Sequence, residues 1–412
     1  MNLFDIIAVL ITLTALFSYF NFCYLKLPTT IGVMFISLAL SIGLILLKYT
    51  GLDFTSHAQS IIGEIDFNET LMQGMLSYLL FAGALHVNLD DLADHKWIIA
   101  LSATFGVVCS TFLIGSLFWL LLAWANIELA YIYCLLFGAL ISPTDPIAVL
   151  AILRSAGASK SLETKITGES LFNDGVGVVV FILIASIAIT GKEITAASVI
   201  ILFMEEAIGG AIYGLLLGFV TYWLIKRVDN YQVEILLTLA LVTGGYASAS
   251  AMHISGPIAV VVAGLMIGNQ GRLLAMSNLT REHLDTFWEL IDEILNAILF
   301  VLIGLEILIL SFDYNILAIG LPAIMIVLAG RFVSVGLPVT IVRLHREFSP
   351  HAIKILTWGG LRGGISVALA LSIPPGPERE IILTVTYCVV IFSILVQGLT
   401  IGKLIRWSTN SA

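Results

Sequence analysis

Charged residues are scarce in this sequence. Asp, Glu, Lys and Arg make up only 11% of the 412 residues, whereas a soluble domain carries roughly 25%. Hydrophobic residues make up 59% of the chain. A globule of this composition would have too little polar surface to stay dissolved, so the scarcity of charge excludes a soluble fold. The composition indicates an all-α polytopic membrane protein.

Paired cysteines and an excess of basic residues are also lacking. The four cysteines are scattered through apolar stretches without a C-x-x-C pair, which disfavours a disulfide or zinc framework. The 19 Lys and Arg are outnumbered by 28 Asp and Glu, so no nucleic-acid partner is expected. The first residues lack the basic stretch of a signal peptide, and we expect the first apolar run to remain as a transmembrane helix.

Apolar runs long enough to cross a bilayer, which takes roughly 20 helical residues, recur along the whole chain. We predict thirteen membrane spans, of which the short ninth is the weakest because it begins with a Gly-Pro pair. The spans are 3–22, 27–47, 71–89, 97–124, 129–153, 166–190, 196–225, 233–252, 254–268, 287–310, 314–342, 352–373 and 381–401.

The basic residues predict how these spans are oriented. With the N-terminus outside, 14 of the 19 Lys and Arg fall on the inner side and 3 on the outer side, and Arg331 and Arg362 fall within spans. The positive-inside rule expects such an asymmetry. We therefore predict an N-terminus outside, a C-terminus in the cytoplasm and the plasma membrane as location. The short tails favour a bacterial inner membrane.

The fifth predicted span contains a carboxylate between two prolines. Residues 142–146 read Ser-Pro-Thr-Asp-Pro, so Thr144 and Asp145 lie between Pro143 and Pro146. Each proline lacks an amide hydrogen and clashes with the preceding turn, so we expect the helix to break here. Broken helices near the bilayer midplane expose backbone groups that transporters use to bind ions.

The sixth predicted span carries polar residues on one face. Ser170 and Asp174 are four residues apart and share a face, and Asn173 lies beside them. Their carboxylate, hydroxyl and amide oxygens are hard ligands that suit Na⁺. Because desolvation disfavours a bare carboxylate, a proton and a cation are expected to compete for Asp174.

The twelfth span contains a second candidate break. Four glycines, Gly360 and Gly363 among them, surround Arg362 at residues 359–364. This span stands second in the triplet of spans eleven to thirteen, as the proline-broken span stands second in spans four to six. The two triplets insert in opposite orientations, and paired broken helices in inverted halves are typical of secondary transporters.

The chain resembles a known family at these three motifs. Residues 142–146, residues 168–174 (Gly-Glu-Ser-Leu-Phe-Asn-Asp) and residues 358–363 (Trp-Gly-Gly-Leu-Arg-Gly) are similar to the NhaP-type sodium/proton antiporters of the monovalent cation/proton antiporter superfamily. The motifs occur in the same order and span nearly the whole chain. The resemblance implies an inverted-repeat antiporter fold of about 13 helices, with two broken helices that cross in the core.

The resemblance also implies roles for individual residues. Asp174 is implied to bind cation and proton alternately, Ser170 and the Thr144 backbone to be direct ligands of the transported Na⁺, and Asp145 to lie close by. Asn173 stands where electrogenic relatives carry a second Asp, which implies electroneutral 1:1 exchange.

Two further implications concern residues outside this ligand set. Glu169 and Arg331 are implied to form a buried ion pair that joins two core helices. Some relatives carry an acid on the third span where this chain has none before Asp90, so water or His86 is left to complete the ion's shell.

The implied organisation is a homodimer with two domains per subunit. A dimerisation domain comprises residues 1–95 and 230–312, a core transport domain comprises residues 96–192 and 313–412, and residues 193–229 link them. Transport follows alternating access. No cofactor is expected beyond the transported Na⁺ and H⁺, and the partners are monovalent cations, protons and the lipid bilayer.

Alternative functions remain open at this point. Asp145 and Asp174 could form the dyad of an intramembrane aspartyl protease, but a dyad does not call for prolines on both sides of one aspartate. A cation or proton channel needs a file of weak sites, whereas these motifs form one cluster. We therefore expect a transporter rather than an enzyme. Na⁺ is preferred, and Li⁺ and K⁺ remain alternatives.

Overall fold

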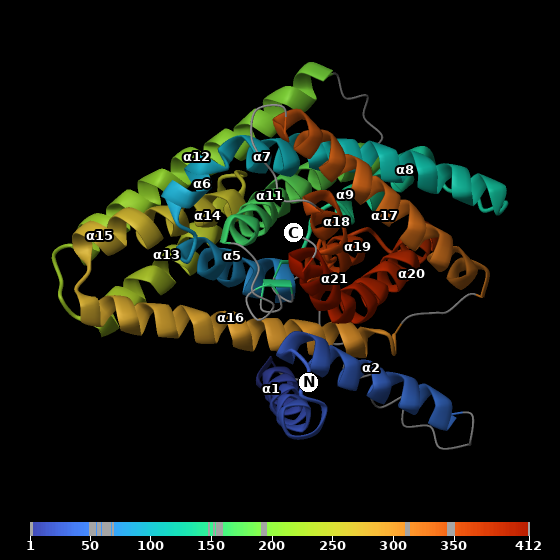
Figure 1. Cartoon of the computed structure of the whole chain (residues 1–412), viewed down its shortest axis with the longest axis horizontal. Coiled ribbons are helices and arrows are strands. Elements are labelled where there is room, and N and C mark those ends of the chain that lie inside the picture. Colours follow the sequence, from blue (N-terminus) through green and yellow to red (C-terminus); the bar gives the residue numbers. More distant parts are fainter. Residues whose placement is uncertain are drawn as a thin grey trace.

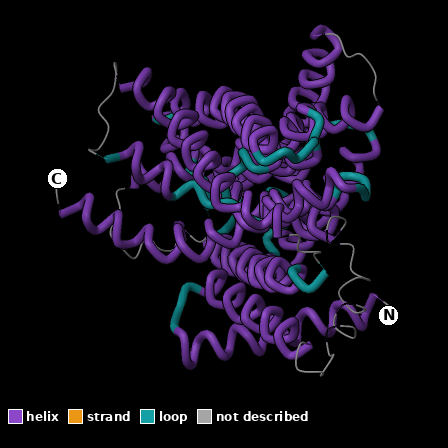
Figure 2. Tube along the Cα trace, turned by 90° about the vertical axis from the view of Figure 1, so that its right-hand side faces the viewer, coloured by secondary structure: helices purple, strands orange, loops and turns teal. Residues whose placement is uncertain are grey.

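The computed structural model describes residues 3–48, 70–146, 160–190, 196–309, 314–343 and 351–410, together with residues 55, 59, 67, 149, 150 and 153. Nearly all of this part of the chain is helical, and its residues form no β-sheet (Figures 1 and 2). The sequence prediction of an all-α fold is therefore confirmed.

The helices follow one another along the chain with short connections. The first half contains α1 Leu3–Phe20, α2 Thr29–Lys48, α5 Leu76–Leu85, α6 Leu89–Asp94, α7 Lys96–Leu101, α8 Val107–Trp124, α9 Tyr131–Leu140 and α11 Lys160–Thr190. The second half contains α12 Ala196–Ile225, α13 Tyr231–Ala251, α14 Gly256–Met266, α15 Arg272–Ala275, α16 Asn278–Glu306, α17 Tyr314–Arg343, α18 Ala352–Trp358, α19 Gly364–Leu371, α20 Pro377–Phe392 and α21 Gly398–Asn410. Single π-helical turns adjoin or join several of them at Asn21–Leu25, Thr70–Met75, Ser102–Gly106, Ile267–Gly271 and Ser393–Gln397.

Many of these helices have the length and composition of membrane spans. Within the described ranges, 9 helices are long and apolar enough to cross a bilayer, and Thr70–Leu85 and Tyr131–Leu140 are shorter apolar helices. Each of the thirteen predicted spans contains helix, while thirteen crossings remain a prediction. The chain is a multi-pass membrane protein.

Two predicted span starts differ from the helix starts. α11 begins at Lys160 rather than at 166, and α16 begins at Asn278 rather than at 287. In α16 the Ser277 hydroxyl accepts a hydrogen bond from the Thr280 amide at 3.3 Å, which caps the helix. An apolar run marks the part of a helix that lies in lipid, whereas the cap that starts the helix lies in its polar extension.

The Gly-Pro pair that weakened the ninth predicted span turns out to start a helix. Pro257 occupies the first turn of α14, where its missing amide hydrogen leaves no helical bond unmade. The Ser255 hydroxyl accepts from the Ile258 amide at 3.4 Å and caps the helix. α14 continues through the π-helical turn into α15, so the helical stretch reaches Ala275 and is long enough to span a membrane.

The helices pack in two groups. In one group α8, α9, α17, α19 and α20 pack against one another, with α11 against α9. In the other, α12, α13, α14 and α5 pack together, and α16 packs on α5 and α13. α16 also packs on α1 and α2, which lie on its other side in Figure 1.

The contact between α8 and α9 depends on two glycines. A Cβ atom at Gly138 would overlap the Thr111 carbonyl, and one at Gly115 would lie 2.9 Å from the Cys134 carbonyl. The backbones of the two helices therefore lie in direct contact. Small residues at such an interface allow the close packing that drives helix association in lipid, where the hydrophobic effect between helices is absent. This contact fixes the helix that leads into the first break.

Replacing Gly138 with Ala should destabilise the protein, because the added methyl group forces α8 and α9 apart. Overpacking of this kind costs about 1–3 kcal/mol. We expect a lower melting temperature for the purified protein in detergent, measured by the loss of the monodisperse peak after heating. Gly244→Ala is the matched control, since a Cβ at Gly244 meets nothing within 4 Å. Equal melting temperatures for the two variants would contradict the close contact.

Candidate functional site

The first helix break lies between the two prolines, as the sequence predicts. α9 ends at Leu140, residues 142–146 leave the helical path, and helical bonding resumes where the Leu150 amide donates to the Pro146 carbonyl at 2.7 Å. Since Pro146 has no amide hydrogen, the Ser142 carbonyl four residues earlier loses its helical donor. A free carbonyl in the interior of a membrane protein needs another partner.

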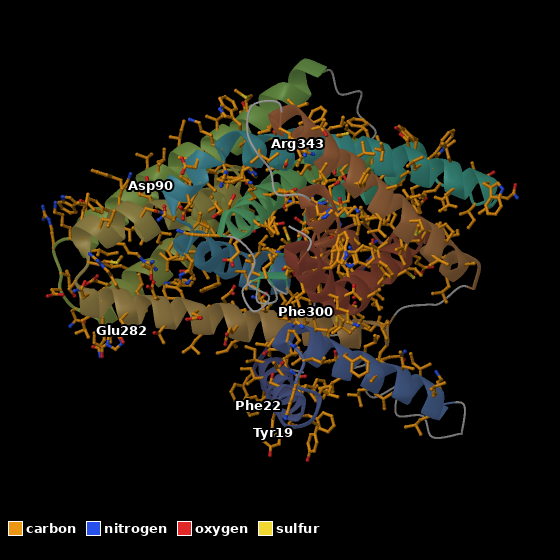
Figure 3. The ribbon with its side chains drawn as sticks, in the orientation of Figure 1. Tyr19, Phe22, Asp90, Glu282, Phe300 and Arg343 are labelled. Atoms are coloured by element: carbon orange, nitrogen blue, oxygen red, sulfur yellow. The ribbon has the colours of Figure 1, made fainter. Side chains whose placement is uncertain are left out.

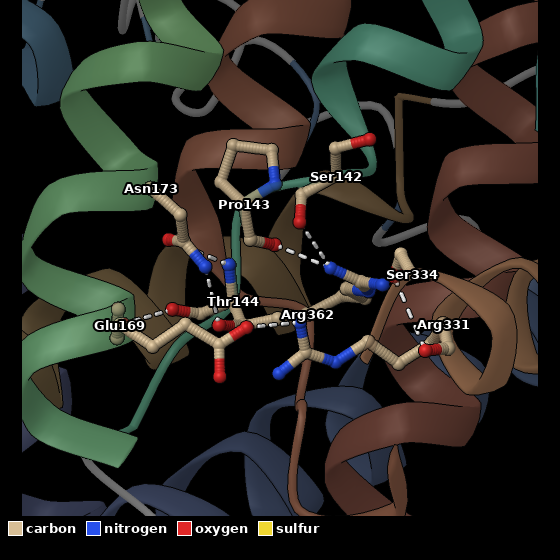
Figure 4. A network of polar contacts seen from close by, with 9 residues as sticks. Ser142, Pro143, Thr144, Glu169, Asn173, Arg331, Ser334 and Arg362 are labelled. Atoms are coloured by element: carbon tan, nitrogen blue, oxygen red, sulfur yellow. Dashed lines mark hydrogen bonds and ion pairs between the residues drawn. The ribbon is translucent and has the colours of Figure 1, made fainter. Parts of the chain in front are cut away.

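Arg362 supplies that partner. Its Nη1 donates to the Ser142 carbonyl at 2.6 Å and to the Pro143 carbonyl at 2.8 Å (Figure 4). The side chain is 2% exposed. The guanidinium therefore lies at the C-terminal end of α9, where the helix dipole favours a positive charge. The sequence analysis assigned Arg362 to the second break but did not foresee that it satisfies the first.

The second helix break crosses the first. α18 ends at Trp358 and α19 begins at Gly364, with an extended segment between them. The Asp145 amide donates to the Leu361 carbonyl at 2.8 Å, and these two residues form an antiparallel bridge. The Arg362 amide donates to the Ser393 hydroxyl at 2.9 Å. Two broken helices that cross in the core are thus confirmed.

Two glycines of the second break allow close approach. A Cβ at Gly363 would overlap the Asp145 carboxylate, and a Cβ at Gly360 would lie 2.5 Å from Nε of Arg331. Neither position has room for a side chain. The glycines flanking Arg362 therefore permit the crossing as well as the break.

α11 holds the first break through Thr144. The Asn173 amide nitrogen donates to the Thr144 hydroxyl at 2.8 Å, and the Asn173 amide oxygen accepts from the Thr144 backbone amide at 3.3 Å. The Ser170 hydroxyl donates to the Thr144 carbonyl. The backbone and hydroxyl of one residue are thus bound from the same helix face, and Figure 4 shows Asn173 beside Thr144.

Asp174 lies one turn along α11 from Ser170 and is 9% exposed. It lies near enough to Asp145 for the two negative charges to repel each other. Two carboxylates close together in a poorly solvated site favour the uptake of a proton or a cation. The structure therefore brings together the five residues that the sequence singled out on the two elements, which are Thr144, Asp145, Ser170, Asn173 and Asp174.

Glu169 and Arg331 join α11 to α17. Oε1 of Glu169 lies 2.5 Å from Nη1 of Arg331, and their side chains are 5% and 8% exposed. The Arg331 carbonyl accepts from the Ser334 hydroxyl at 3.1 Å. The pair lies next to the second break, since Gly360 packs on the Arg331 guanidinium.

One acidic residue close to this site was missed. Asp292 of α16 lies near enough for the Asp145 charge to act on it. It falls within the predicted span 287–310, so the rule that an ionisable residue in a span is a functional candidate should have selected it. The sequence analysis applied that rule only near Pro and Gly breaks.

These features define a class of protein. Two interrupted helices that cross in a membrane bundle, beside a helix with oxygen ligands and acidic side chains, form the architecture of a secondary transporter.

Comparison with known proteins is consistent with this class. The family model described as sodium/hydrogen exchanger, transmembrane, matches residues 9–407. The chain belongs to the sodium/hydrogen exchanger family. It is 53% identical over 409 residues to the Na(+)/H(+) antiporter NhaP of Pseudomonas aeruginosa, covering 98% of this chain and 96% of that protein. It is 36% identical over 387 residues to the Na(+)/H(+) antiporter NhaH of Halobacillus dabanensis, covering 93% and 92%.

A solved structure shares the fold. The sodium proton antiporter MjNhaP1 of Methanocaldococcus jannaschii superposes with a TM-score of 0.76 at 20% identity, over 98% of this chain and 99% of that one. At this identity the likeness concerns the fold alone.

Replacing Arg331 with Ala should leave the Glu169 carboxylate buried without its partner. Breaking one side of a buried pair costs about 3–5 kcal/mol, so we expect the yield of folded protein to fall along with transport. The measurement is the monodisperse fraction and melting temperature in detergent. A double variant, Glu169→Gln with Arg331→Met, should recover part of the loss. A fully stable Arg331→Ala protein would show that the pair has no structural weight.

Proposed function

We propose that this protein exchanges a monovalent cation for H⁺ across the membrane, one for one, by alternating access. Na⁺ is the preferred cation, with Li⁺ and K⁺ as alternatives. The observation that carries the proposal is the buried Asp174 carboxylate on α11, which lies beside Asp145 at the crossing of the two broken helices. The similar proteins from Pseudomonas aeruginosa and Halobacillus dabanensis carry the name Na(+)/H(+) antiporter, which supports this choice of ions.

Asp174 is the residue for which the two ions compete. A bare carboxylate is costly in a dry interior, whereas a protonated or cation-bound carboxyl is not. The site therefore passes through the membrane with either ion but not without one. This restriction alone couples the two fluxes.

Oxygen atoms around Asp174 complete the cation site. The Ser170 hydroxyl and the Thr144 carbonyl already lie together because one donates to the other. A cation that binds between them replaces the hydroxyl proton in that position. Asp145, held at the crossing by its backbone bond to Leu361, contributes charge directly or through water. Such hard oxygen ligands suit Na⁺.

Asn173 sets the stoichiometry of the exchange. Its two amide atoms hold the hydroxyl and the amide of Thr144, so it positions the broken segment and carries no proton itself. One titrating carboxylate gives one proton per cation. Glu169, Arg331 and Arg362 stabilise the elements that carry the site and take no part in binding the ion.

The core transport domain comprises residues 96–192 and 313–412, and moves against a dimerisation domain made of residues 1–95 and 230–312. Residues 193–229, which include α12, link them. The packing of α8, α9, α17, α19 and α20 with one another and of α16 with α1, α2 and α5 supports this division. The movement carries Asp174 from access on one side to access on the other.

The protein acts as a homodimer in the plasma membrane, in the bacterial inner membrane by the organisms of its relatives. Its N-terminus lies outside and its C-terminus in the cytoplasm, as the distribution of Lys and Arg favours. The two ions are substrates, and the exchange requires no cofactor and cleaves no bond, so the protein is a carrier and not an enzyme.

Replacing Asp174 with Asn should abolish exchange, because an amide binds neither the proton nor the cation with charge. Purified protein is placed in liposomes with an acidic lumen and a trapped pH dye, and Na⁺, Li⁺ or K⁺ is added outside. We expect saturable alkalinisation of the lumen by wild-type protein and none by Asp174→Asn. Asp90→Asn, which removes an exposed acid, is the matched control and should retain the activity.

The same assay tests stoichiometry and class. Setting the membrane potential to zero with valinomycin and K⁺ should leave the Na⁺-driven rate unchanged, and an accelerated rate would contradict one-for-one exchange. A flux that rises with the gradient without saturating would indicate a channel. Cation-driven proton movement by Asp174→Asn would remove Asp174 from its role.

Replacing Ser170 with Ala should weaken cation binding while leaving the proton site in place. The variant loses one oxygen ligand and the bond to the Thr144 carbonyl. We expect the apparent KM for Na⁺ to rise about tenfold, which corresponds to about 1.4 kcal/mol, with the maximal rate nearly unchanged. Initial rates over a range of Na⁺ concentrations measure this. A loss of maximal rate at constant KM would show that Ser170 supports the movement and not the ion.

A further inference from the structure

One face of α16 is directed at the crossing of the broken helices. Near the start of this face, Trp288 packs against Phe81 of α5 with ring centroids 4.6 Å apart. Further along, Leu299 lies against Gly364 at the start of α19, since a Cβ added to Gly364 would lie 2.6 Å from its side chain. Asp292 and Asn296 fall between Trp288 and Leu299 at helical spacing, so they share this face.

Asn296 has a buried amide group without a well-formed hydrogen bond. The residue is 1% exposed, and neither its amide nitrogen nor its amide oxygen has a hydrogen-bond partner. Leaving a buried polar group unsatisfied costs about 1–3 kcal/mol. An apolar side chain of the same size would stabilise the helix better. The amide therefore has to be explained by something that it binds.

Asp292 lies one turn before Asn296 on the same face, and the Asn296 amide approaches its carboxylate. The negative charge of Asp145, from the crossing, also acts on Asp292. Asp145 thus lies between two further carboxylates, Asp174 on α11 and Asp292 on α16. Such an arrangement attracts a cation to the α16 side of the crossing as well as to the α11 side.

We propose that Asp292 and Asn296 form a second station for the transported cation, where a monovalent cation is held by carboxylate and amide oxygens before it reaches Asp174. The inference rests on the proposed function, because it assumes that the cation travels to Asp174. The station consists of hard oxygen ligands, as the main site does.

Exposed acids lead up to this station. Glu289 and Glu293 of α16 are exposed, Asp292 is half-buried and Asn296 is buried, so the helix presents a graded path from solvent to the crossing. With the proposed topology α16 starts in the cytoplasm. Figure 3 shows Glu282 near that start and Phe300 towards the other end. The station therefore serves cations that enter from, or leave to, the cytoplasmic side.

The first test is the variant Asp292→Asn in proteoliposomes with a known orientation. For Na⁺ presented to the cytoplasmic face, we expect the apparent KM to rise about tenfold with the maximal rate nearly unchanged. For Na⁺ presented to the opposite face, the KM should not change. Asp292→Glu should restore most of the affinity. Glu282→Gln, which removes an exposed acid from the same helix, is the matched control.

A second variant separates binding from structure. Asn296→Leu removes an amide that has no hydrogen bond, so we expect a higher melting temperature together with a higher KM for cytoplasmic Na⁺. A residue with a merely structural role would show the opposite, a lower melting temperature at an unchanged KM, and that result would overturn the proposal. An unchanged KM in both Asp292→Asn and Asn296→Leu would do so as well.

The outcome for the station can be distinguished from that for the main site. In the Asp174→Asn background transport is absent, so the readout is stabilisation of the protein by added NaCl over choline chloride during heating. We expect part of the Na⁺ effect to remain in Asp174→Asn and to disappear when Asp292→Asn is added. If it disappears in Asp174→Asn alone, the station is wrong while the main site stands. If Asp174→Asn still exchanges ions, the proposed function fails first.

Discussion

The site depends on one constraint, which is that each backbone polar group inside the membrane needs a partner within the protein. Two helices give up their regular bonds near the same point, and each break supplies what the other lacks. The Asp145 amide binds the Leu361 carbonyl, and the Arg362 side chain binds the carbonyls of Ser142 and Pro143. The crossing is therefore a single unit, and neither break is stable without the other.

α11 adds the second layer of this arrangement. Ser170 and Asn173 bind Thr144 at three of its polar groups, and Glu169 on the same helix pairs with Arg331 of α17. Because these bonds fix the extended segment to one rigid helix, Asp174 keeps a defined position relative to the Thr144 carbonyl. The polar residues of this motif thus divide into those that shape the site and one that exchanges ions.

The sequence predicted the fold class, the spans and both breaks, since apolar length, Pro and clustered Gly have local causes. It also selected the residues that meet at the crossing, because charges within spans are rare enough to stand out. It did not predict that Arg362 satisfies the carbonyl freed by Pro146, because that contact joins positions 220 residues apart. Asp292 was missed for a different reason: it lies in a helix whose acids continue beyond the apolar run. The polar starts of α11 and α16 were misjudged because apolar patterning does not mark a helix cap.

The neutral Asn173 has a consequence for how the cell can use this protein. With an amide in place of a second carboxylate, the proton-loaded and cation-loaded forms of the proposed carrier have the same net charge. The membrane potential then performs no work on a complete cycle and cannot drive it in either direction. Exchange stops when the cation ratio across the membrane equals the proton ratio, so each unit of transmembrane pH difference sustains about a tenfold difference in cation concentration. The direction of net flux is therefore set by the two concentration ratios alone, and it reverses when their order reverses.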